Sequence, residues 1–79
     1  MEIEVNGEKR RADDMTIQEY LCSLSIDARR VAVELNLTIL AKAEFATTRL
    51  SEGDRIEIVH FVGGGQGGSA SWLKERTSW

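Results

Sequence analysis

The longest strand-like segment of this chain, Arg55–Val62, ends directly at the glycine-rich sequence GGGQGG. Its β-branched and aromatic residues alternate with period two, which is typical of an extended strand. Ile56 and Ile58 fall on one face of that strand, and Val59 and Phe61 fall on the other. The glycines and serines between position 63 and Trp72 cannot hold a core, because they supply no large apolar side chain.

The size and charge of the chain exclude several classes of protein. A chain of 79 residues forms at most one small core, which favours a binding or carrier module over a self-sufficient enzyme. The formal net charge is −3 and no basic stripe is present, so nucleic-acid binding is not expected. No catalytic constellation, metal site or cofactor site is indicated.

Targeting signals are also missing from the sequence. The start, MEIEVNGEKRR, lacks the basic residues and the apolar run of a signal peptide, and no stretch has the length of a membrane span. With one cysteine, Cys22, the chain forms no internal disulfide and needs no oxidising compartment. These features predict a cytoplasmic protein that does not contact membranes.

The first half of the chain predicts a hairpin followed by a helix. Met1–Val5 alternates apolar and polar residues, and the Asn-Gly pair that follows is a strong signal for a tight hairpin turn. Residues 9–12 would form the returning edge strand. A helix is predicted over Ile17–Leu24, because Thr16 and Glu19 have the spacing of a capping box and the apolar residues recur on one helical face.

The second half predicts further strands. Val31–Asn36 alternates again, and Ile39 and Leu40 form a short strand. Phe45 and Leu50 are expected core residues, and SEGD at 51–54 is a turn that leads into the last strand.

These elements together predict an α+β fold of the β-grasp, ubiquitin-like type. One main helix packs on one face of a mixed sheet of four to five strands, and the last strand lies parallel to the first. The expected organisation is a β-grasp domain at 1–62, a flexible glycine arm at 63–68 and a disordered C-terminal extension at 69–79.

Three segments carry a resemblance to a known family: VAVELN at 31–36, TTRLSEGDRIEIVHF at 47–61 and VGGG at 62–65. On these segments the chain resembles the ThiS family, the β-grasp sulfur carriers of the thiamin pathway, over nearly all of residues 1–65. Two features depart from the family pattern. Asn36 is followed by Leu37, where the family often has glycine, and QGGSASWLKERTSW follows Gly65, where the family usually ends.

The resemblance implies a chemical role for the glycines. A ThiF-type adenylating enzyme would activate the C-terminal carboxylate, a cysteine desulfurase system would supply sulfur, and the resulting thiocarboxylate would donate it to thiazole synthase. Gly65 is the expected adenylation and thiocarboxylate site, with Gly68 as the alternative. Gly63 and Gly64 lack a Cβ and would let the tail enter a narrow channel of a partner. Taken without its context, GGGQGG is also compatible with a plain linker.

Four other side chains have both a functional and a structural interpretation. Val59 and Phe61, on the face opposite the helix, are candidate partner-binding residues, or else neighbouring side chains cover them. Cys22 is interpreted as a small packing residue of the helix rather than a sulfur-transfer thiol. His60 has no evident catalytic partner in the sequence and is assigned a packing or surface role.

Other functions remain open at this level. A sulfur carrier of another pathway, such as the small subunit of molybdopterin synthase, ends in a similar Gly-Gly. A ubiquitin-like modifier would be joined through its C-terminus to lysine side chains. A plain interaction domain would use the glycines only as a linker.

Overall fold

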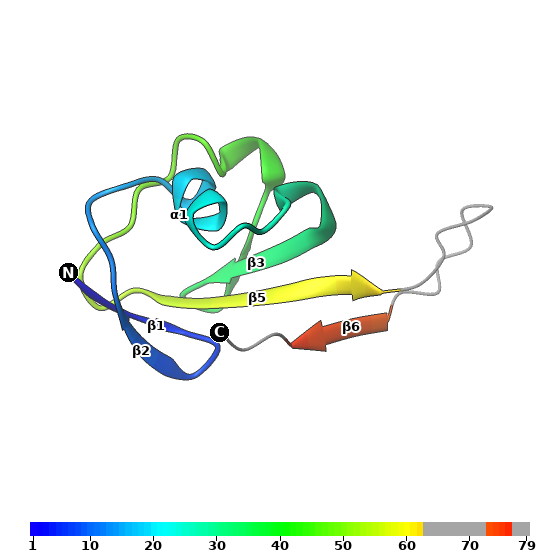
Figure 1. The fold of residues 1–79 in the computed structure, drawn as a ribbon, viewed down its shortest axis with the longest axis horizontal. Helices are drawn as coiled ribbons and strands as arrows, with labels where there is room; N and C mark the ends of the chain where they lie inside the picture. The colour runs from blue at the N-terminus through cyan, green and yellow to red at the C-terminus, as the bar shows by residue number, and fades with distance from the viewer. Residues whose placement is uncertain (63–72, 77–79) are drawn as a thin grey trace.

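The computed structural model describes residues 1–62 and the backbone of residues 73–76. Within these ranges the chain forms one mixed sheet with a helix packed across one of its faces (Figure 1). The α+β, β-grasp prediction is confirmed. The elements along the chain are β1 (Glu2–Val5), β2 (Glu8–Arg11), α1 (Ile17–Ser23), η1 (Ala28–Arg30), β3 (Val31–Leu35), β4 (Thr38–Leu40), η2 (Lys42–Glu44), β5 (Arg55–Val62) and β6 (Leu73–Arg76).

The strand order is β2-β1-β5-β3-β4, and β6 also pairs with β5. The predicted parallel pairing of the first strand with β5 is present, with Glu4 opposite Arg55 and Val5 opposite Ile56. The remaining neighbours in the sheet are antiparallel, and β3 accompanies β5 from Ile56 to His60. β5 is therefore the central strand that the other strands border.

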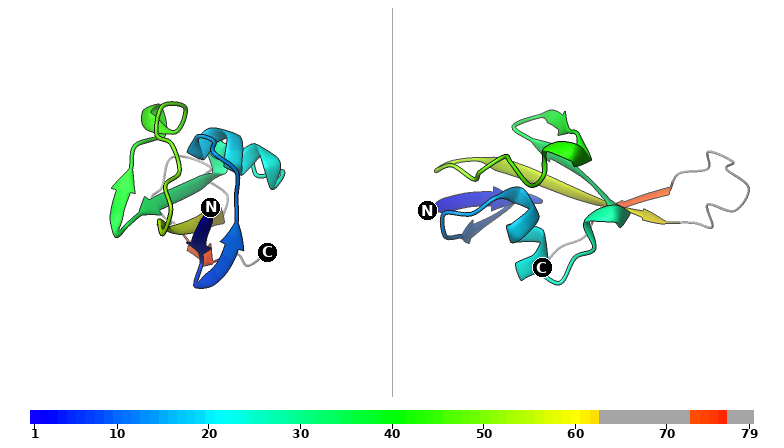
Figure 2. Two further views of the ribbon diagram at one scale, coloured as in Figure 1. Left: turned by 90° about the vertical axis from the view of Figure 1, so that its left-hand side faces the viewer. Right: turned by 90° about the horizontal axis from the view of Figure 1, so that it is seen from above.

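The core lies between the sheet and helix α1. The end-on view shows the helix across this face of the sheet (Figure 2). Among the residues whose burial the structure describes, the buried apolar side chains lie between positions 3 and 58: Ile3, Val5, Ile17, Tyr20, Leu21, Ile26, Val31, Val33, Phe45, Leu50, Ile56 and Ile58. This confirms the two faces assigned to β5 and the expected core positions of Phe45 and Leu50. The described members of this cluster end at Ile58, five residues before the first of the glycines at 63–65.

Helix α1 begins where the sequence predicts it. The Thr16 hydroxyl accepts a hydrogen bond from the backbone N–H of Glu19 at 3.1 Å, and the Glu19 carboxylate accepts one from the N–H of Thr16 at 2.9 Å. This reciprocal pair satisfies two amides that the first helical turn leaves without partners. Cys22 is exposed on this helix, so its interpretation as a packing residue is wrong. Cys22 is next in sequence to Leu21, which is buried, but it does not lie on the buried face of α1.

Two tight hairpins use residues with positive φ. Asn6 and Gly7, with φ of 50° and 85°, connect β1 to β2 as the Asn-Gly signal predicts. The loop between β3 and β4 has the same geometry at Asn36 and Leu37, with φ of 52° and 72°. A branched side chain in this region of φ clashes with its own backbone, so Leu37 is strained. It is also 76% exposed and gains little from packing.

We predict that Leu37→Gly stabilises the domain by about 0.5–1 kcal/mol. The change relieves a left-handed strain of roughly 1–2 kcal/mol, part of which is offset by the greater entropy of glycine in the unfolded chain. The melting temperature should rise by about 2–6 °C in thermal unfolding followed by circular dichroism. Leu37→Ala is the matched control, because it removes the same exposed side chain but keeps the Cβ. An equal gain from both variants would contradict the strain argument.

Candidate functional site

The candidate site is the end of β5 that leads to the glycines. Gly63, Gly64, Gly65 and Gly68 lie outside the described residues, so their predicted roles rest on the sequence. These glycines follow β5, and β3 pairs with one edge of β5 as far as His60. The position and direction of Val62 at the start of the glycines are thus set by the sheet.

The side chain of Asn6 fixes β5 on its other edge. Its Nδ2 donates to the carbonyl of Ile58 at 3.2 Å, and its Oδ1 accepts from the N–H of Ile58 at 2.7 Å. The backbone N–H of Asn6 also donates to the carbonyl of Ile56 at 2.9 Å. The carboxamide of Asn6 therefore adds one more pair of hydrogen bonds to those between β1 and β5. The positive φ of Asn6 at the same time turns the main chain away toward β2. Sequence reasoning assigned Asn6 only to the turn, since a contact across 52 residues leaves no local signal.

One cationic side chain, Lys42, lies beside the end of β5. Lys42 Nζ donates to the backbone carbonyl of Arg29 at 2.8 Å and lies 5.5 Å from the centroid of the Phe61 ring. This is the geometry of a cation–π contact. Arg30 precedes β3 and lies 3.6 Å from the carboxylate of Asp27, measured from its Nε.

Asp27 organises the short η1 helix at this end of the molecule. Its carboxylate accepts from the backbone N–H of Arg29 at 3.0 Å and from the Arg29 guanidinium at 2.9 and 3.1 Å. These hydrogen bonds lower the pKa of Asp27 to about 2. The carboxylate therefore stays ionised near neutral pH, and the cap of η1 stays formed. Neither η1 nor η2 has a clear sequence signal, because each is three residues long.

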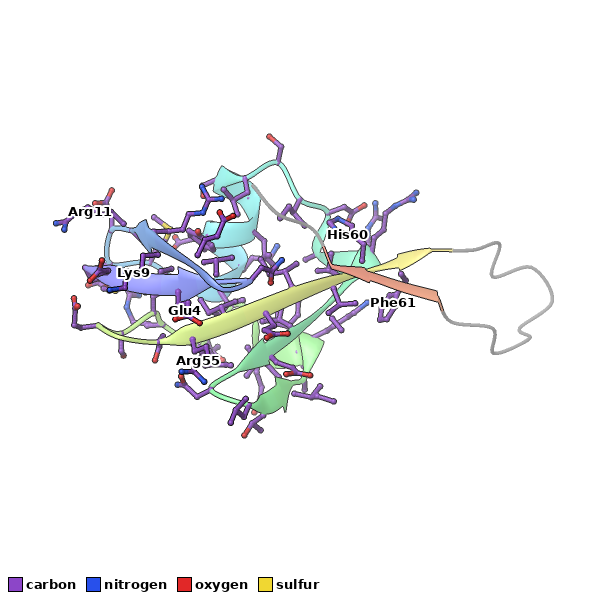
Figure 3. All side chains as sticks on the ribbon, turned by 90° about the horizontal axis from the view of Figure 1, so that it is seen from below. Glu4, Lys9, Arg11, Arg55, His60 and Phe61 are labelled. Atoms are coloured by element: carbon purple, nitrogen blue, oxygen red, sulfur yellow. The ribbon has the colours of Figure 1, made fainter. Side chains whose placement is uncertain are left out.

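The two predicted partner-binding residues lie on the open face of the sheet. Val59 and Phe61 are both half-buried, so neighbouring side chains cover part of each and leave part accessible. Figure 3 shows this face from the side opposite α1, with Phe61 near the end of β5. Farther along the same face the carboxylate of Glu4 lies 3.5 Å from Arg55 Nε. The face is polar at the β1 end and presents an aromatic side chain at the end next to the glycines.

The described residues offer few groups for catalysis. Among residues 1–62 and 73–76, no three His, Cys, Asp or Glu side chains gather in a way that could hold a metal ion. His60 is half-buried within β5, between Val31 of β3 on one side and Glu75 of β6 on the other. Cys22 is exposed on α1. The described helices are also too short and too polar to cross a membrane.

Strand β6 differs from what the sequence predicts. We expected residues 69–79 to be disordered, yet residues 73–76 form a strand antiparallel to β5, with Val59 opposite Arg76 and Val62 opposite Leu73. Figure 2 shows this strand running back along the end of β5. Its sequence, LKER, lacks β-branched residues, and its pairing depends on an edge that the sequence pattern does not reveal. The rest of the expected extension lies outside the described residues.

The family assignment follows from a match over most of the chain. Residues 3–65 match the model of the ThiS family. This chain belongs to the ThiS family. The match begins at the first buried residue of β1 and ends at Gly65, the position that the sequence analysis selects as the working terminus.

Similar proteins and structures agree with this assignment. The sulfur carrier protein ThiS of Bacillus subtilis is 42% identical over 65 residues, which cover 80% of this chain and 98% of that protein. A crystal structure of the thiamine biosynthesis protein ThiS from Geobacter metallireducens superposes with a TM-score of 0.72 at 35% identity, covering 82% of this chain and all of that one. Both comparisons extend over the β-grasp domain.

Two longer proteins also contain a similar segment. The thiazole synthase of Paramagnetospirillum magneticum is 44% identical over 66 residues, and that of Magnetococcus marinus is 39% identical over 67 residues. The aligned part is 82–84% of this ThiS chain but only 20–21% of those proteins. The chain thus spans about a fifth of their length.

We predict that Ile58→Asp unfolds this ThiS domain, whereas Phe61→Asp leaves it folded. Ile58 is 0% exposed, so an ionised carboxylate there would lose its water without gaining a partner, at a cost of several kcal/mol. This approaches the total stability of a small domain, about 5 kcal/mol at the lower end. Phe61 is half-buried on the open face, where a carboxylate can reach water and Lys42.

Circular dichroism melts of the two variants measure the difference directly. Phe61→Asp should keep a cooperative transition and lose binding to an adenylating enzyme of the ThiF type in a pull-down. Equal loss of structure in both variants would contradict the assignment of the two faces.

Proposed function

We propose that this ThiS chain is a protein-borne sulfur carrier of thiazole biosynthesis and acts as a substrate of its partner enzymes. The observation that carries this proposal is the near full-length match to the Bacillus subtilis sulfur carrier. A central strand that is held on both edges and leads directly into Cβ-free residues supports the role. Such a strand presents a thin arm in a defined direction, which suits delivery of a terminal group into another protein.

The proposed chemistry takes place on the α-carboxylate of Gly65. A carboxylate is a poor electrophile, so it first attacks the α-phosphorus of ATP and displaces pyrophosphate, giving an acyl-adenylate. A sulfur nucleophile then attacks the acyl carbon, and the C–O bond to AMP breaks. When the nucleophile is a persulfide of the donor, the product is an acyl disulfide. A thiol of the partner system then attacks the donor's sulfur, the S–S bond breaks by reduction, and the arm ends in a thiocarboxylate. Every step uses groups that the partners supply.

We propose three partners and a compartment. A ThiF-type enzyme performs the adenylation, a cysteine desulfurase system provides the sulfur, and thiazole synthase receives it. A segment similar to this chain within two proteins named thiazole synthase supports the last of these. All of this chemistry belongs in the cytoplasm, where ATP and thiols are available.

The working terminus is proposed to be Gly65, reached by cleavage of the bond to Gln66. In the uncut chain this glycine carries an amide and has no carboxylate to activate. A terminus at Gly68 would lengthen the arm by roughly 10 Å when extended and would place the Gln66 side chain in the channel. The family match, which ends at residue 65, supports the shorter arm.

We predict that an ATP–pyrophosphate exchange assay with the adenylating enzyme ranks three versions of the chain. The version ending at Gly65 should exchange fastest, the version ending at Gly68 should be slower, and the uncut chain should be inactive. Exchange by the uncut chain would show that cleavage is unnecessary, and a faster Gly68 version would move the terminus. Intact-mass spectrometry after sulfur transfer should show one oxygen replaced by sulfur on the active version. An adduct on lysines would instead indicate a ubiquitin-like modifier.

A further inference from the structure

The end of β5 has an edge that β1 does not cover. β1 pairs with β5 only at Arg55 and Ile56, and the Asn6 side chain extends that ladder to Ile58. The main chain then leaves the sheet at the hairpin turn, while β5 continues to Val62. The last residues of β5 therefore lie beyond the reach of β1.

The backbone groups on this edge can be assigned from the observed hydrogen bonds. The carbonyl of Ile56 and both backbone groups of Ile58 are bonded to Asn6, so they face the β1 side. Alternate residues of a strand direct their N–H and C=O to the same edge. His60 and Val62 consequently present their N–H and C=O groups on this side too.

β6 fills this part of the edge. His60 lies opposite Glu75 and Val62 opposite Leu73, while Phe61 lies opposite Lys74. Because antiparallel pairs alternate, Glu75 directs its N–H toward β5 and Lys74 directs its N–H away. Residues 63–72 connect the two strands, and the proposed cleavage after Gly65 falls within that connection.

We propose that Val59–Val62 form a strand-docking edge and that β6 is its autoinhibitory occupant, which covers the edge in the uncut chain and leaves it once the chain is cleaved. The proposal rests on the proposed cleavage, which detaches β6 in the same step that creates the Gly65 carboxylate. A short connection holds an attached strand at an effective concentration on the order of millimolar. A partner strand of similar intrinsic affinity competes poorly with β6 before cleavage and binds freely afterward. The edge adjoins the first glycine, so a strand docked there would orient the arm.

The first experiment tests the occupied edge in the uncut chain by amide hydrogen exchange. Glu75→Pro removes an N–H that faces β5, so exchange of the His60 amide should accelerate at least tenfold. Lys74→Pro is the matched control, because proline is tolerated in an edge strand where the N–H faces outward. It should leave His60 protected. Unchanged His60 exchange in Glu75→Pro would overturn the proposal.

The second experiment supplies the strand in trans. Residues 1–65 contain every buried core residue that the structure describes, and the Geobacter ThiS chain matches 82% of this chain over its own full length, so we expect this version to fold by itself. Both tryptophans of the chain lie in residues 69–79, and a peptide of that sequence reports binding by its own fluorescence. We expect a dissociation constant at or below the millimolar range, with amide shifts confined to residues 59–62. The same peptide with proline at position 75 should bind at least tenfold more weakly.

Three outcomes would contradict the proposal: no binding of the peptide, amide shifts on β4 or β2 instead, or a dimer of the uncut chain that exchanges β6 between copies. Neither experiment involves ATP or sulfur. A failure here would leave the proposed carrier function intact. A failure of pyrophosphate exchange by the version ending at Gly65 would leave the pairing of β6 with β5 to be decided by these two experiments.

Discussion

The parallel contact between β1 and β5 is the interaction on which the rest of this structure depends. It joins the two ends of the described domain, brings Ile3 and Val5 beside Ile56 and Ile58, and closes the core beneath α1. The contact involves few backbone pairs, so the carboxamide of Asn6 reinforces it with two further hydrogen bonds to Ile58. These side-chain hydrogen bonds replace the backbone hydrogen bonds that β1 can no longer make with β5 once the chain turns at Asn6.

Much of the fold could be predicted because its determinants are local. The alternation in β1, β3 and β5, the capping box at Thr16 and the Asn-Gly turn all depend on residues a few positions apart. The parallel pairing of the first strand with β5 was predicted because these two strands are the most regular and the hairpin occupies only one side of the first. The features that sequence reasoning missed are either very short, such as η1 and η2, or depend on distant partners, such as β6 and the Asn6 bridge. A pattern of side chains does not reveal which backbone edge remains available.

The site was predicted more through the resemblance than through physical patterns. Glycines after a strand indicate an arm, but their chemistry follows from the family and not from any cluster of reactive groups. The face assignment of Val59 and Phe61 came from period-two alternation and agrees with their half-buried state. The contact of Lys42 with Phe61 was not foreseeable, because it joins η2 to β5 across a loop. Cys22 shows a limit of the helical pattern itself, because a side chain one position beside the apolar stripe is already exposed.

The last described core residue is Ile58, so the described core packing does not involve the glycines after Val62 and can occur in different protein contexts. The described core contacts end at Ile58, so a segment joined after Val62 can change the reach of the arm without replacing any of those contacts. A domain of this kind can be released as a separate carrier or built into a longer polypeptide with the same internal packing. The occurrence of a similar segment within proteins five times its length fits that modularity. Evolution can thus vary the tail and the neighbouring domains while the scaffold that aims the glycines stays unchanged.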